Sequence, residues 1–178
     1  MKIRMFGRRR KNSGYTIIEM LVVLFIVGIL VGMVLTNTRD AKDRARYARV
    51  KSDMDGIIKV IVAVRDEKQK NLQQITGSVC SNCPCLGRDI RLVPDTDNCA
   101  VSWGLALGKI KTAAGSLGSG LDGVSRDPWG SPYSLDENEG ETGTNDCRND
   151  LLSSAGEDGV LGTADDIIIP ISLYKTCP

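Results

Sequence analysis

A single carboxylate lies within a long apolar segment near the N-terminus, and no other position in the sequence is chemically so demanding. Residues 17–35 read IIEMLVVLFIVGILVGMVL, and Glu19 is the only charge in this run. A carboxylate inside a membrane is costly unless it has a partner, so such a residue is a functional site by default. The alternative is a signal-anchor helix in which Glu19 lies at the headgroup level without a special role.

Cysteines form a second set of residues that could do chemistry. All six follow the apolar segment, and their spacing starts with C-x-x-C-x-C. Four thiols between residues 80 and 99 could bind zinc or act as a redox group. An even number of cysteines in a small exported domain instead favours disulfides. We expect two bridges within residues 80–99 and one between the last two cysteines, with zinc and a catalytic thiol as alternatives. The cysteines are Cys80, Cys83, Cys85, Cys99, Cys147 and Cys177.

Charge is strongly segregated along the chain, although the net charge is only +1. Residues 127–178 contain 2 basic and 11 acidic side chains, a net charge of −9. An acidic end favours cation binding and predicts no nucleic-acid partner. The sequence contains no histidine, which removes Ser-His-Asp and Cys-His catalysis. We therefore expect a protein that is not an enzyme and has no catalytic residues.

The apolar segment predicts a retained transmembrane helix over residues 15–36. At 1.5 Å per residue its 19-residue run covers roughly 28 Å, about the thickness of a bilayer core. Residues 1–14 carry six basic and no acidic side chains. By the positive-inside rule the N-terminus stays in the cytoplasm and everything after Leu35 is exported. Gly28 and Gly32 form a GxxxG pair, which either permits close helix packing or is incidental.

The remaining chain predicts an α+β fold. An apolar stripe with steps of three and four residues indicates that the helix continues as an amphipathic segment over residues 37–70. Its apolar face needs a domain to cover it, which we place at residues 71–178, with a cysteine loop at 76–100. A mildly helical segment, a glycine- and serine-rich loop at 115–120 and three short strands should follow, giving a small antiparallel sheet. Pro170 predicts that the last strand is an edge strand or is kinked.

The junction at residues 11–19, KNSGYTIIE, resembles the signal of type IV pilins and of type II secretion pseudopilins. In that family a prepilin peptidase cuts after the glycine and methylates the new N-terminus. The resemblance implies that the leader 1–14 is removed after Gly14 and that Tyr15 becomes the methylated first residue. Glu19 would then be the fifth residue, with the new amine as its partner, either within one helix or across to a neighbouring subunit.

Two later segments look like the major pseudopilin of type II secretion. They are DPWGSPY at residues 127–133 and SAGEDGVLGTADDI at residues 154–167. The resemblance covers roughly residues 14–70 and 127–168 and leaves out the cysteine region between them. In that family the acidic loop, here residues 155–166, binds calcium, an ion that takes six to eight oxygen ligands from a flexible loop. The matching ligands are Ala155, Asp158, Val160, Thr163, Asp165 and Asp166. The alternative is a solvated acidic turn.

Together with these residues, the resemblance implies a structural pilin or pseudopilin of a type IV pilus-like or type II secretion filament. The expected partners are further copies of this chain, other pilin-like subunits, the prepilin peptidase, an inner-membrane assembly platform and membrane lipid. The expected location is the inner membrane, with one span and the C-terminal domain outside, and then a periplasmic or cell-surface filament. The alternative is a membrane-anchored calcium- or ligand-binding module that does not polymerise.

Overall fold

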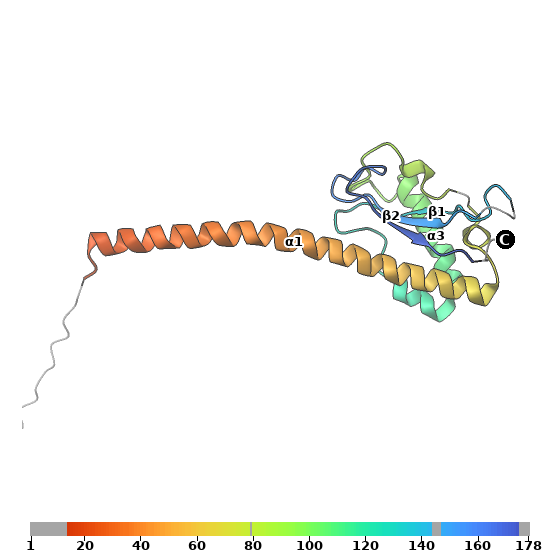
Figure 1. Cartoon of the computed structure of the whole chain (residues 1–178), viewed down its shortest axis with the longest axis horizontal. Coiled ribbons are helices and arrows are strands. Elements are labelled where there is room, and N and C mark those ends of the chain that lie inside the picture. The colour runs from red at the N-terminus through yellow and green to blue at the C-terminus, as the bar shows by residue number, and fades with distance from the viewer. Residues whose placement is uncertain (1–13, 79, 144–146, 175–178) are drawn as a thin grey trace, which may run out of the picture. The chain divides into compact units, whose positions relative to one another are not determined.

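The computed structural model describes residues 14–78, 80–143 and 147–174, without the side chains of residues 33–38. It divides into two compact units, residues 1–43 and 44–178. Helix α1, Ile17–Lys68, runs through both (Figure 1) and agrees with the continuous helix predicted over residues 15–36 and 37–70. Among the described residues, no helix has a stretch that is long and apolar enough to cross a membrane. Part of the predicted span, at residues 33–36, falls on side chains outside this description.

Three short strands form the predicted antiparallel sheet in the second unit. Strands β1 (Ser134–Asp136), β2 (Asp150–Ser154) and β3 (Ile167–Ile171) pair in the order β1-β2-β3 (Figure 1). Pro170 lies opposite Leu151, on β3, which is an edge of this sheet. The prediction that proline confines the last strand to an edge is therefore confirmed, because proline has no N–H to give to a further strand.

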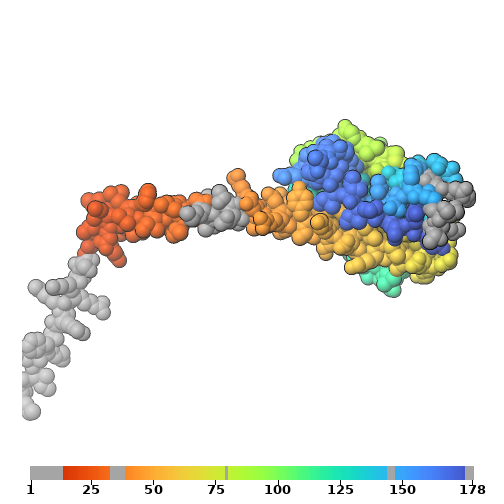
Figure 2. Space-filling view, viewed as in Figure 1, coloured from red at the N-terminus to blue at the C-terminus, as the bar shows by residue number. Residues whose placement is uncertain are grey.

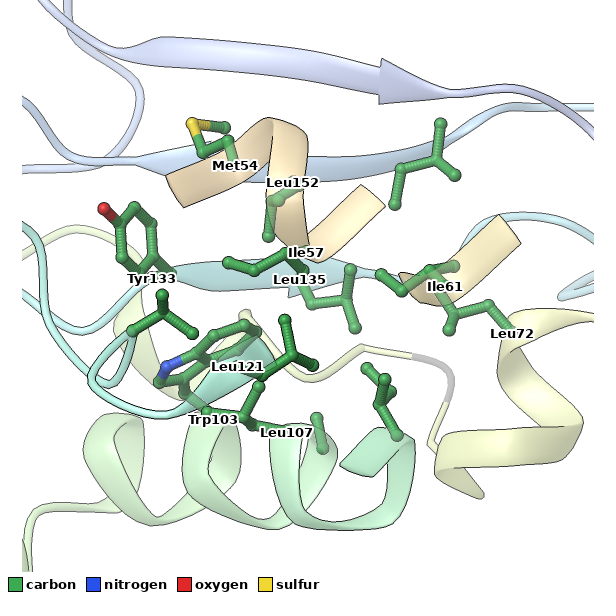
Figure 3. Packing of buried hydrophobic residues seen from close by; sticks show 14 of the residues in the cluster. Met54, Ile57, Ile61, Leu72, Trp103, Leu107, Leu121, Tyr133, Leu135 and Leu152 are labelled. Carbon is green, nitrogen blue, oxygen red and sulfur yellow. The ribbon is translucent and has the colours of Figure 1, made fainter. Parts of the chain in front are cut away.

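The main hydrophobic core lies between α1, the sheet and helix α3, Asn98–Ala114. Figure 3 shows Ile57 from α1 close to Leu135 of β1 and Leu152 of β2. Trp103 lies on the α3 side of the same cluster, 6.0 Å from the ring of Tyr133 in a T-shaped arrangement. The stripe residues of α1 in this unit that are fully or almost fully buried are Val50, Met54, Ile57, Ile61 and Val64.

Short helical elements connect these parts. Helix α2, Leu72–Thr76, starts with a capping box in which Asn71 and Gln74 bond each other's backbone, and it ends at Gly77 in the left-handed conformation. One 3₁₀ turn, η1, covers Cys83–Cys85. The glycine- and serine-rich segment expected as a loop is a 3₁₀ helix, η2 (Gly115–Leu121). The prediction of a loop was wrong. Glycine and serine favour turns, and in this segment successive turns form a short 3₁₀ helix.

Two disulfides close the cysteine region, as predicted. One joins Cys80 to Cys83 and the other joins Cys85 to Cys99. Cys147 is also disulfide-bonded, but its expected partner Cys177 lies outside the described residues.

A buried ionic cluster ties the end of α1 to the sheet. Arg65 is only 2% exposed. Its Nη1 atom lies 3.5 Å from Glu139 Oε2 and 3.6 Å from Asp150 Oδ2, and its Nη2 donates to the carbonyl of Ser172 at 2.5 Å. The N–H of Tyr174 donates to Glu139 Oε2 at 2.9 Å. One cation therefore joins segments that are 74 to 107 residues apart in sequence.

Candidate functional site

Glu19 occupies the first turn of α1, where the structure shows a local partner for it. The Glu19 carboxylate accepts from the N–H and the hydroxyl of Thr16, both at 3.4 Å, and the Thr16 hydroxyl accepts from the Glu19 N–H at 3.3 Å. This is the reciprocal arrangement of a capping box, and it stabilises the start of the helix. The motif Thr-x-x-Glu is readable in the sequence, so this second role of Glu19 could have been predicted. It leaves the expected role in assembly untested.

The described large apolar side chains of the first unit are exposed. Those between residues 15 and 31 are 46% to 84% exposed, with Ile17 the most exposed and Phe25 at 70%. Soluble proteins rarely expose a contiguous apolar surface of this kind unless it binds another protein or a membrane. The segment around Glu19 is therefore suited to contact lipid or further helices.

The second candidate motif, at residues 127–133, is organised by one buried carboxylate. Asp127 is 5% exposed and accepts from the N–H of Trp129 at 3.0 Å and of Ser131 at 2.9 Å. It also accepts from the hydroxyl of Ser154 at 2.7 Å. Burial raises the pKa of Asp127, although these three donors act against it. The motif is thereby joined to the end of β2, one residue before the acidic loop.

Two contacts fix this turn to α1 within the same unit. The rings of Trp129 and Tyr47 meet edge to face with centroids 5.1 Å apart. The hydroxyl of Tyr133 donates to Asp53 Oδ2 at 3.0 Å, and Asp53 lies 3.6 Å from Arg49. Burial, followed by the charge of Asp53, raises the pKa of Tyr133. These contacts join the turn at residues 127–133 to the part of α1 that lies in the same unit.

The acidic loop at residues 155–166 is closed by its own hydrogen bonds. Asp165 Oδ2 accepts from the N–H of Asp158 at 2.9 Å, and its Oδ1 accepts from the Thr163 hydroxyl at 2.7 Å. Asp166 Oδ2 accepts from the N–H of Gly162 at 2.7 Å. The Asp158 N–H, followed by the Thr163 hydroxyl, lowers the pKa of Asp165. Gly156 has a φ of 62°, and a Cβ there would lie 2.4 Å from the Asp165 carbonyl oxygen, so this position requires glycine.

The acidic loop carries oxygen atoms of the types that bind metal ions. Asp166 Oδ1 is buried and has no hydrogen-bond partner. Burial raises the pKa of Asp166, and the nearby charges of Asp165 and Asp158 raise it further. Carboxylate, hydroxyl and carbonyl oxygens are the ligands that calcium prefers. Within the described residues, however, no three carboxylate, histidine or cysteine side chains are gathered closely enough to form a metal-binding group. The acidic residues would have to converge further to hold an ion.

The comparisons with known proteins give the family. Residues 9–35 match the prokaryotic N-terminal methylation motif. A relative from Aeromonas hydrophila, type II secretion system core protein G, is 31% identical over 166 residues, covering 90% of this chain and 93% of the relative. The chain belongs to this core protein G family. The core protein G of Escherichia coli K12 is also 31% identical, over 158 residues that cover 88% of this chain and 90% of the relative. No solved structure gives a significant match.

Membership in the core protein G family confirms the resemblance drawn from residues 11–19 and 127–168. The chain is a pseudopilin, a structural subunit of a type II secretion filament. The matched segment at 9–35 contains Gly14, Tyr15 and Glu19, so these residues lie in the methylation motif. The predicted cut, the methyl group and the calcium ligands themselves stay predictions.

The buried cluster around Arg65 was missed by sequence reasoning. Glu137 was missed as well: it is fully buried and accepts from the N–H of Ser81 at 2.8 Å and from the Ser81 hydroxyl at 2.6 Å. Burial raises the pKa of Glu137. Its partner is 56 residues away in the sequence, and no local pattern indicates such a pair.

Proposed function

We propose that this chain is a structural subunit of a type II secretion filament, processed by a prepilin peptidase and polymerised through its N-terminal helix. The observation that carries the proposal is full-length similarity to core protein G together with the methylation motif over residues 9–35. Removal of residues 1–14 would leave Tyr15 as the N-terminal residue and Glu19 as the fifth.

The exposed apolar side chains of residues 15–31 support assembly in and from a membrane. Before assembly, inner-membrane lipid would cover them, with the N-terminus in the cytoplasm and the C-terminal domain outside. In the filament, the same surface would pack against further copies of this chain and other pilin-like subunits. An inner-membrane assembly platform would transfer the subunit from lipid to filament. The apolar surface of residues 15–31 would therefore contact either lipid or neighbouring subunits, but not both at once.

Glu19 has the central role in this assembly. Its carboxylate is exposed in the chain and bonds only weakly to Thr16, at 3.4 Å, so it is available to a neighbour. The methylated amine of a neighbouring subunit would neutralise it inside the filament core, where an unpaired charge is costly. Pairing of this kind also sets the axial register of the subunits.

Glu19→Ala tests this role. The variant should stay in the membrane and be cleaved, but filament yield in sheared or cross-linked fractions should fall at least tenfold. Thr16→Val is the matched control, because it removes the two hydrogen bonds of the Thr16 hydroxyl and keeps both the carboxylate and its bond from the N–H of residue 16. Thr16→Val should still form filaments. Normal filaments from Glu19→Ala would contradict the proposed role, and equal loss in both variants would reduce Glu19 to a helix cap.

Calcium is the proposed ligand of the loop at residues 155–166. The unpartnered Asp166 Oδ1 and the mutual repulsion of Asp158, Asp165 and Asp166 support it. An ion there would bind the folded chain only, adding about 2.7 kcal/mol at a hundredfold excess over the dissociation constant. For a domain of this size the melting temperature should rise by roughly 10 °C.

The test compares melting of the oxidised full-length chain in detergent with calcium and with chelator. Asp166→Asn is the sharpest variant, because the amide oxygen can still accept from Gly162 while the charge is lost. It should abolish the calcium shift and leave melting in chelator within a few degrees of wild type. Asp122→Asn, a change at a surface carboxylate paired with Lys111, serves as the charge control and should keep the shift. Equal melting temperatures of the wild type in calcium and in chelator would contradict calcium binding by this loop.

A further inference from the structure

The cysteine region contacts the acidic loop directly. We call residues 85–99, which the Cys85–Cys99 disulfide closes, the disulfide insert. In Figures 1 and 2 its yellow-green residues lie beside the blue loop that precedes β3. The N–H of Ile90 donates to the carbonyl of Gly159 at 2.9 Å, and Asp89 forms a single β-bridge with Val160. The insert therefore adds a short piece of antiparallel pairing to the loop.

Arg91 makes the charged contact between the two segments. Its Nη1 donates to the carbonyl of Glu157 at 2.9 Å. Its Nε and Nη2 donate to Asp89 at 3.0 and 2.6 Å, which fixes the direction of the guanidinium. A Cβ on Gly159 would lie 2.3 Å from Arg91 Cγ. Only glycine at position 159 lets the loop backbone approach the Arg91 side chain this closely.

An apolar cluster lies beneath these polar contacts. Cys85, Cys99 and Ile90 of the insert are fully buried and pack with Ala155 and Leu161 of the loop. The disulfide is thus part of the surface on which the acidic loop rests. The disulfide restricts the conformations of the insert in the unfolded chain. Residues 89–91, which contact the acidic loop, lie within the segment that it closes.

From these contacts we propose that Arg91 is a positioning residue that holds the acidic loop in its folded conformation without a metal ion. The guanidinium fixes the Glu157 carbonyl and places a positive charge beside a loop of carboxylates. The disulfide insert supplies the rigid base from which Arg91 acts. The loop is then stabilised in two independent ways, by Arg91 at all times and by calcium when it is present. The second way rests on the calcium binding proposed above.

Hydrogen exchange of the full-length, oxidised chain in detergent tests this proposal. In chelator, peptides covering residues 155–162 of the wild type should be protected from exchange. Arg91→Met should make them exchange about five- to tenfold faster, because a hydrogen bond from a charged donor is lost. Added calcium should restore protection in Arg91→Met and should raise the melting temperature of this variant as it does that of the wild type.

Arg88→Met is the matched control. Arg88 is 40% exposed and pairs with Asp97, as Arg91 is 42% exposed and pairs with Asp89. Arg88 bonds Asp97 and the carbonyl of Pro84, both within or beside the insert. Its loss should leave exchange of residues 155–162 within twofold of wild type.

The exchange rates of these variants decide whether Arg91 holds the acidic loop. Wild-type protection in Arg91→Met, or equal loss of protection in Arg88→Met, would overturn the proposal. Faster exchange in Arg91→Met alone, with no response to calcium in any variant, would support Arg91 as the positioning residue and remove calcium from the proposed function. Faster exchange with rescue by calcium would support both.

Discussion

Replacing Asp150 by asparagine tests whether the buried ionic cluster makes the folded domain sensitive to pH. Asp150 is 1% exposed; its Oδ1 accepts from the Glu139 N–H at 2.8 Å, whereas its Oδ2 has no hydrogen-bond partner and lies 3.6 Å from Arg65. Burial raises the pKa of Asp150 from 3.8 to about 6, and the charges of Glu139 and Glu137 act in the same direction. The hydrogen bond from the Glu139 N–H and the attraction of Arg65 lower the pKa of Asp150, but burial outweighs both.

The effect of Asp150 on the free energy of unfolding follows from its pKa in the unfolded and folded states. Below about pH 4 the carboxyl is protonated in both states, and its contribution to stability is complete. Between about pH 4 and pH 6 the folded state keeps the proton that the unfolded state releases, so the free energy of unfolding falls as pH rises. A shift from 3.8 to about 6 corresponds to a loss of roughly 3 kcal/mol by pH 7. Asparagine keeps the acceptor for Glu139 and cannot ionise, so this loss should disappear.

Thermal unfolding of the full-length chain, followed by the near-ultraviolet signal of Trp103 and Trp129, is a suitable assay. Asp150→Asn should melt several degrees higher than wild type at pH 7.5, and the difference should shrink toward pH 4. Asp122→Asn, at the surface, should follow the wild-type profile. If Asp150→Asn keeps the full decline between pH 4 and pH 6, burial of this carboxylate is not its source. Lower stability at every pH would mean that the ion pair with Arg65 outweighs the cost of burial.

Two further variants test the packing around this cluster. Arg65→Met should lower the free energy of unfolding by roughly 3–5 kcal/mol at pH 7.5, because Glu139 and Asp150 would stay buried without their cation; chemical denaturation measures it, and a change below 1 kcal/mol would show that the cluster is hydrated. Ile57→Ala should cost roughly 2–5 kcal/mol in the same assay, since Ile57 is fully buried in the main core, whereas Ile168→Ala, at a side chain that is 51% exposed, should cost little.

Local patterns in the sequence were enough to predict the long helix α1 and the three strands. The apolar stripe of α1, the strand-like runs before Pro170 and the turn residues between them all act over a few positions. Helix α2 was missed, although the pair Asn71 and Gln74 is a readable capping box, because its five residues are too few to show a periodicity. The 3₁₀ helix η2 was missed because a run of glycine and serine gives no helical signal.

The candidate sites also divide into those that local sequence indicates and those that depend on distant contacts. Glu19 and the acidic loop stand out because their residue types are unusual for their surroundings. The contact of Arg91 with Glu157 joins residues 66 positions apart, and that of Arg65 with Glu139 spans 74. Both arginines lie in segments with several other charges, so nothing nearby marks them. Such partners become visible only when the chain is folded.

The most direct test of the central claim is the intact mass of the chain extracted from membranes of cells that contain a prepilin peptidase. The account predicts a protein that begins at Tyr15 and carries one added methyl group at its N-terminus. A Gly14→Asp variant should keep residues 1–14 in the same preparation. A wild-type mass that starts at Met1, or an N-terminus beyond Leu35, would contradict assignment of this chain as a processed filament subunit.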